Sequence, residues 1–83
     1  MANRAIRGVV DSTIKEGYGI ADGFCDKLYV EENRIFLTLR VYLKYGVNPA
    51  AVTDSLRTAI KYNVEKFAGA PVALVNISVV GVR

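Results

Sequence analysis

Hydrophobic and polar residues alternate along the middle of the chain, and this alternation predicts a β-hairpin. From residue 35 to residue 44, five aliphatic residues alternate with five others: Ile35, Leu37, Leu39, Val41 and Leu43 with Phe36, Thr38, Arg40, Tyr42 and Lys44. A period of two over this length is typical of a strand with one buried face. Residues 24–30 alternate in a similar way, so we expect them to form the other strand.

A short polar run, residues 31–34, separates the two predicted strands. With a two-residue loop that ends at Asn33, Val30 pairs with Ile35 on the buried face. The same register places Tyr29 opposite Phe36 on the other face. Asn33 suits this loop because asparagine tolerates the positive φ that tight hairpin turns require.

The first residues of the chain carry a helical pattern, since apolar positions recur three or four residues apart. We expect a helix from about Ala2 to Lys15 that ends at Gly17. Gly8 weakens this prediction because glycine is a poor helix former, and a short strand over Ala5–Val10 is the alternative. The glycine-rich segment Gly17–Gly23 is predicted to be a loop.

A second, longer helix follows the hairpin. Asn48 and Pro49 form a start signal, since asparagine caps a helix and proline suits its first position. Gly69 is the predicted end. The apolar stripe of this helix consists of Val52, Leu56, Ala59, Ile60, Val64 and Phe67. The last segment, Val72 to Val82, is apolar at both odd and even positions, which suits a strand covered on both sides.

These elements predict an α+β fold in the order α-β-β-α-β, with a three-stranded sheet and two helices packed on one of its faces. The length of 83 residues fits one domain over residues 1–83. Hydrophobic residues make up 52% of the chain and charged residues 23%, which is typical of a globular protein. We find no apolar run that suits a signal peptide or a membrane span.

The sequence lacks the usual side chains of catalysis. It contains no histidine and one cysteine, Cys25, so neither a Ser-His-Asp triad nor a Cys-His pair is available. Asp26, next in the chain, opposes formation of the thiolate, and we interpret Cys25 as an inert thiol of a strand. The acidic residues lack the spacing of a calcium loop. We therefore expect a cytoplasmic protein that is not an enzyme, with no catalytic residue, cofactor, metal or small-molecule substrate.

Three segments resemble the bacterial alkaline shock protein family, whose members are also described as general or envelope stress proteins. They are GYGI at residues 17–20, VYLKYG at residues 41–46 and VNISVVGVR at residues 75–83. The resemblance implies a non-enzymatic cytoplasmic protein, sometimes held at the membrane by a partner, with a role in cell-envelope stress or lipid metabolism. No catalytic residues come with it.

One face of the predicted sheet points away from both helices and is rich in aromatic and aliphatic residues. We assign to it Tyr29, Phe36, Arg40, Tyr42, Lys44, Val72, Leu74 and Val80. Large exposed apolar patches usually mark interfaces, and aromatic residues and arginine are enriched there. We therefore predict an interface for copies of the chain or for a protein partner. An ordinary solvated sheet face is the other interpretation.

The same aromatic and basic residues allow an alternative function, a small nucleic-acid-binding module similar to a KH domain. Sheets that bind RNA stack bases on aromatic side chains in this way. Two observations weigh against it: no GXXG loop lies between adjacent helices, and the cations are spread along the chain. The net charge of +3 is also mild for such a partner.

Overall fold

The computed structural model describes residues 3–83, and its elements follow the predicted order. They are α1 (Asn3–Glu16), β1 (Ile20–Glu31), β2 (Arg34–Leu43), α2 (Pro49–Ala68) and β3 (Val72–Val82). The first segment is a helix, so the alternative of a strand there is wrong. The predicted helix start at Ala2 lies outside the described residues.

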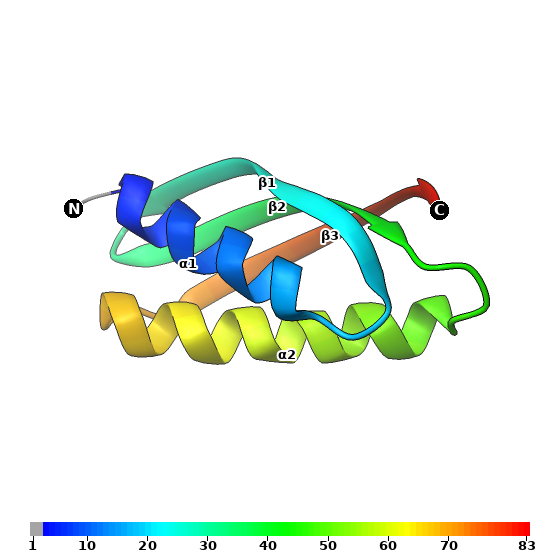
Figure 1. Ribbon diagram of the computed structural model, residues 1–83. Coiled ribbons are helices and arrows are strands. Elements are labelled where there is room, and N and C mark those ends of the chain that lie inside the picture. The colour runs from blue at the N-terminus through cyan, green and yellow to red at the C-terminus, as the bar shows by residue number, and fades with distance from the viewer. Residues whose placement is uncertain (1–2) are drawn as a thin grey trace.

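The sheet has β2 at its centre, antiparallel to β1 and parallel to β3. Both helices pack on the same face, with α1 against β1 and α2 against α1 and β3 (Figure 1). In Figure 1, α2 runs back along the length of the sheet before β3 begins, which is what a parallel β2–β3 pair requires.

The hydrophobic core lies between the helices and the inner face of β2. Every second residue of β2 is almost fully buried, and these residues are Ile35, Leu37, Leu39, Val41 and Leu43. The helices contribute Ile6, Val10 and Ile14 from α1 and Val52, Leu56, Ile60 and Val64 from α2. One polar side chain joins this layer: the buried Thr13 hydroxyl donates to the Val9 carbonyl and accepts a 3.0 Å hydrogen bond from Asn63.

The hairpin has the predicted register, with Val30 opposite Ile35 and Tyr29 opposite Phe36. Its two loop residues, Glu32 and Asn33, both have positive φ, at 51° and 61°. Two consecutive left-handed residues twist the backbone in the same sense as the flanking strands. The prediction of a two-residue loop at this position is confirmed.

The start of β1 differs from the prediction, because the expected loop over residues 17–23 ends at Gly19 and the strand begins at Ile20. The strand continues through Gly23, opposite Val41, where the missing side chain leaves room for α1. Two bulges, between Ile20 and Asp22 and between Cys25 and Lys27, also interrupt the alternation. The second bulge turns Cys25 toward the core, on the opposite side from Tyr29.

The second helix has both predicted ends. The Asn48 side chain accepts a 3.2 Å hydrogen bond from the Ala51 amide, and Gly69 caps the other end at a φ of 69°. Phe67 was wrongly assigned to the buried stripe, since it is exposed. The buried positions recur every four residues from Val52 to Val64, so a residue three positions further lies to one side of the stripe.

Val72 was assigned to the open face, and this assignment is wrong. It lies opposite Ile35 and is 7% exposed, as part of the core. The pairing of β3 with β2 shifts by one residue between Val72 and Leu74. This irregularity places Val72 and Leu74 on opposite faces, although their spacing in the sequence predicts the same face. The strand β3 is also an edge strand, and within residues 3–83 its Leu74 and Val80 side chains are exposed and not covered, contrary to the prediction.

The close contact between α1 and β1 at Gly23 can be tested by substitution. A Cβ atom at this position would lie 2.8 Å from Ile14 Cγ2 and 2.9 Å from Val41 Cγ1. We expect Gly23→Ala to lower the free energy of unfolding by about 1–3 kcal/mol, because the core is overpacked. Urea denaturation followed by circular dichroism measures the change.

Gly8 provides the matched control, since a Cβ there would meet nothing within 4 Å and the residue lies inside α1. Gly8→Ala should raise the free energy of unfolding by about 0.5–1 kcal/mol, because alanine favours a helix. Equal stability of Gly23→Ala and the wild-type chain would show that the helix does not depend on this close approach.

Candidate functional site

The candidate site is the open face of the sheet, which lies opposite the two helices. Its central row is formed by the outward residues of β2, with Phe36 near the hairpin loop and Tyr42 near the other end. Residues of β1 and β3 flank this row. Their chemistry divides the face into an aromatic end and a charged end.

The aromatic end is built around Phe36. Its ring stacks on that of Tyr29 in the neighbouring strand, with ring centroids 4.8 Å apart and planes 6° from parallel. On the other side, Leu74 of β3 lies opposite Phe36. Tyr29 is 50% exposed and Leu74 is 49% exposed. The three predicted residues thus form one continuous apolar surface that crosses all three strands.

The charged end holds arginines that pair with nearby carboxylates. Arg40 Nε lies 3.3 Å from an oxygen of Asp26. The Arg83 guanidinium lies 3.9 Å from the centre of the Tyr42 ring and 3.4 Å from an oxygen of Asp22. Tyr42 therefore contributes an aromatic surface that a cation covers.

Arg83 belongs to the open face, although sequence reasoning did not assign it there. Its backbone N–H donates to the Leu43 carbonyl, and its carbonyl accepts from the Tyr45 amide, so β3 pairs with β2 through the last residue of the chain. A side chain at Gly81 would contact the Tyr42 ring at 3.5 Å. Gly81 and Arg83, both part of the resemblance to the alkaline shock family, thus lie against the Tyr42 ring.

The remaining predicted residues lie at the margins of the face. Lys44 is exposed and follows directly after β2. Val80 is 44% exposed and lies at the second irregularity in the pairing of β3 with β2. Val72 does not contribute, since it is in the core.

Cys25 is buried on the other side of the sheet, under α1. Its carbonyl accepts a hydrogen bond from Arg7, and its amide donates to Asp11 at 3.2 Å. Burial raises the pKa of the Cys25 thiol above its ordinary value of 9.0; the guanidinium of Arg7 lowers this pKa, and the carboxylates of Asp11 and Asp26 raise it further. The environment thus favours the thiol over the nucleophilic thiolate.

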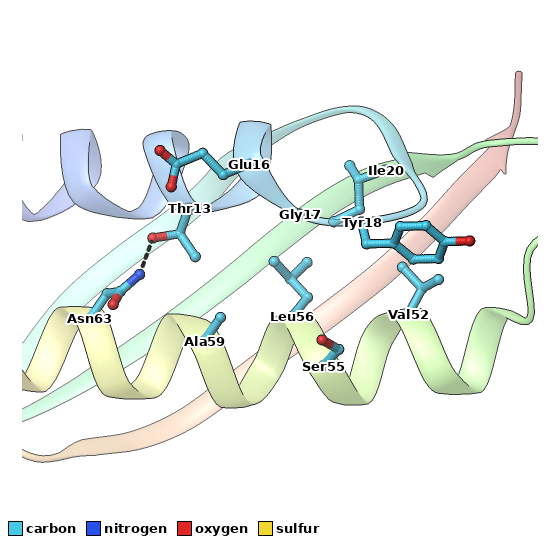
Figure 2. A pocket seen from close by; sticks show the side chains of 10 residues that line it. All are labelled: Thr13, Glu16, Gly17, Tyr18, Ile20, Val52, Ser55, Leu56, Ala59 and Asn63. Atoms are coloured by element: carbon cyan, nitrogen blue, oxygen red, sulfur yellow. Dashed lines mark hydrogen bonds between the residues drawn. The ribbon is translucent and has the colours of Figure 1, made fainter.

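A groove of about 240 Å³ lies between the end of α1 and the middle of α2. Figure 2 shows Val52, Leu56 and Asn63 along its α2 side, with Tyr18 from the glycine-flanked loop at one end. The hydrogen bond between Thr13 and Asn63 crosses it. Its volume lies below the range of about 300–1,000 Å³ that is usual for small-molecule sites.

Neither helix within residues 3–83 is long and apolar enough to cross a membrane. Over the same residues, no three side chains of His, Cys, Asp or Glu gather where they would hold a metal ion.

The fold and the open face define a small two-layer α+β domain in which both helices described over residues 3–83 lie on the same side of the sheet. The model of the alkaline shock protein 23 family, described by its cell envelope-related function, matches residues 1–83. The chain belongs to this family, so the resemblance found in its three sequence segments is confirmed. No curated protein and no solved structure matches the chain significantly.

The environment of Cys25 predicts slow reaction with thiol reagents. At pH 8 the folded chain should react with iodoacetamide at least tenfold more slowly than the chain unfolded in urea, because the thiol is buried and its pKa is raised. The pKa is higher in the folded chain than in the unfolded chain, so the folded chain keeps its proton to higher pH. The free energy of unfolding should therefore be at its full value below pH 9 and should fall as the pH rises further. Equal labelling rates, measured by mass spectrometry, would contradict this account.

Proposed function

We propose that this member of the alkaline shock protein 23 family is a non-enzymatic scaffold or adaptor that binds copies of itself or a protein partner through the open sheet face. Its cell envelope-related role would then depend on assembly and not on catalysis. We place this activity in the cytoplasm, where a membrane partner can recruit the protein indirectly.

The observation that carries the proposal is the aromatic end of the face. Tyr29 is stacked on Phe36 and remains half-exposed, and Leu74 extends the surface to the next strand. Stacking holds both rings in place while Phe36 is only partly buried and Tyr29 stays half-exposed, so little side-chain freedom is left to lose when a partner covers them. Rigid aromatic side chains of this kind contribute strongly to binding at protein interfaces.

The charged end favours a protein over a nucleic acid. Arg40 and Arg83 each lie within 3.4 Å of a carboxylate oxygen, from Asp26 and Asp22. Binding to phosphates depends on cations that displace counterions, and a neighbouring carboxylate weakens that attraction. We therefore retain the protein-binding function and do not propose the nucleic-acid alternative.

The proposal predicts that removal of the aromatic end prevents assembly. The double variant Tyr29→Ser/Phe36→Ser removes the stacked pair but keeps the inner face of the sheet. We expect a lower oligomer mass by light scattering, or at least tenfold weaker capture of a partner from the native cell, because the aromatic contact area is lost. Circular dichroism checks that the domain remains folded.

The control is Tyr62→Ser/Phe67→Ser, which removes two exposed aromatic residues from α2, away from the sheet. This variant should assemble like the wild-type chain. The proposal is wrong if both double variants assemble normally, or if the α2 variant alone loses assembly.

A further inference from the structure

The two edges of the sheet differ in how far they are covered. At the β1 edge, α1 side chains bind the backbone of Cys25 directly: Arg7 donates to its carbonyl and Asp11 accepts from its amide. Two bulges bend this strand, and charged residues such as Asp26 and Lys27 lie along it. Bulges, charges and covering side chains all hinder the addition of another strand.

The β3 edge also has two irregularities, but they lie near its ends and leave its centre regular. Residues 72–82 contain no charged side chain, and the central part of the strand, residues 74–79, pairs with β2 without a bulge. The exposed residues include Leu74 on one face and Val79, which is 42% exposed, in register with the inner face. A long apolar edge strand of this kind readily pairs with another chain.

The hydrogen bonds of the sheet identify which β3 residues have free backbone groups. On the β1 side of β2, the Lys44 amide donates to the Gly19 carbonyl. On the β3 side, the Leu43 carbonyl accepts from the Arg83 amide. Since backbone groups alternate in direction along a strand, the odd-numbered residues of β2 face β3. Leu37 is the partner of Val75, so it bonds to the two neighbours of that residue. Residues 75, 77 and 79 therefore direct their N–H and C=O groups away from the sheet.

Two side chains of α2 reach this edge. At the start of the strand, outside residues 75–79, the Val72 amide donates a 2.8 Å hydrogen bond to Glu65. Arg57 Nε donates to the Val75 carbonyl at 3.5 Å, the limit of a hydrogen bond, and the same guanidinium pairs with Asp54 on the surface of α2. The contact is long and the arginine is about half exposed, so an approaching strand would displace it at small cost.

We propose that β3 pairs antiparallel with β3 of a second copy, which joins the two sheets into one continuous six-stranded sheet. The sequence of the strand suits a two-fold axis at Ile77. In this register Val75 lies opposite Val79 of the second copy, and Asn76 lies opposite Ser78. Asn76 and Ser78, which are both exposed, thus pair with each other across the axis. The residues next to them in the strand, Val75, Ile77 and Val79, pair with aliphatic residues.

No other two-fold register pairs all of residues 72–82, because Ile77 is the middle residue of the strand. The outward groups of residues 75, 77 and 79 then form about six inter-chain hydrogen bonds, two from each of three residue pairs. The contact also covers the exposed Val79 and Val80 side chains. The backbone edge of β3 is distinct from the stacked rings of Tyr29 and Phe36 on β1 and β2, although Leu74 belongs to both surfaces, so the inference goes beyond the proposed function.

Cysteine cross-linking tests the register directly. In this arrangement the two Ile77 Cα atoms are about 5.5 Å apart, within the range that a disulfide spans. We expect Ile77→Cys to form a disulfide-linked dimer under mild oxidation, seen on a non-reducing gel and assigned by mass spectrometry. Cys25 is kept in the variants, because its thiol is buried and should not cross-link. The wild-type chain is therefore the negative control.

Leu74→Cys is the matched control, since Leu74 would lie opposite Val80 of the second copy. The two introduced thiols are then offset by six residues, roughly 20 Å, and should not cross-link. The proposal is overturned if Ile77→Cys stays monomeric, as it would if this edge bound a strand of another protein. It is also overturned if Leu74→Cys cross-links equally fast, which indicates contact through the open face.

A second variant tests the pairing without a cysteine. Val79→Pro removes one outward N–H but no hydrogen bond to β2, because proline is tolerated where the N–H of an edge strand faces solvent. The variant should remain folded and lose the dimer in sedimentation velocity. Tyr29→Ser/Phe36→Ser should keep the Ile77→Cys cross-link, so failure of the edge pairing and failure of the proposed function give different results.

Discussion

The two-sided character of β2 is the constraint on which the rest of the structure depends. Its inner residues are almost fully buried, from Ile35 to Leu43, and they form the layer on which both helices pack. Its outer residues alternate with them and face away from the helices. Because both helices lie on one side (Figure 1), burial of one row leaves the other partly or fully exposed. The open face therefore follows from the strand that forms the core.

The same constraint explains why the two edges differ. The helix α1 packs along β1, where Gly23 allows a close approach and Arg7 and Asp11 reach the backbone of Cys25. The helix α2 lies beside β3 and binds its backbone at two points within residues 3–83: Glu65 accepts a hydrogen bond from the Val72 amide, and Arg57 donates to the Val75 carbonyl at 3.5 Å. The molecule thus combines an exposed aromatic surface with a strand edge that is uncharged and regular at its centre, and both features support the proposed assembly with other chains.

The order of elements and the hairpin register could be predicted because local signals determine them. The alternation of β2, the loop at Asn33 and the cap at Asn48 each depend on a few neighbouring residues. The bulges could not be predicted in this way. A bulge inverts the alternation without a distinctive residue, which is why the buried positions of Cys25 and Val72 were missed.

The contact between Arg83 and the Tyr42 ring also could not be predicted from local sequence. It depends on the pairing between the ends of β3 and β2, which are far apart in the chain. The residues of the open face were predicted because they share a strand or a hairpin, as Tyr29 and Phe36 do. Sequence spacing alone did not show that the arginines of this face have acidic partners from β1, Asp26 and Asp22. These pairs support the proposed protein-binding function over binding to phosphates.

The central claim is that the sheet side of this domain assembles with other chains. Two-dimensional NMR of the wild-type chain over a wide range of concentrations tests it most directly, because each amide reports its own surroundings. The account predicts concentration-dependent changes at the aromatic end, around Tyr29 and Phe36, and along residues 75–79 of β3. Spectra that stay constant at all concentrations, or that change only on the exposed surface of α2, would contradict it.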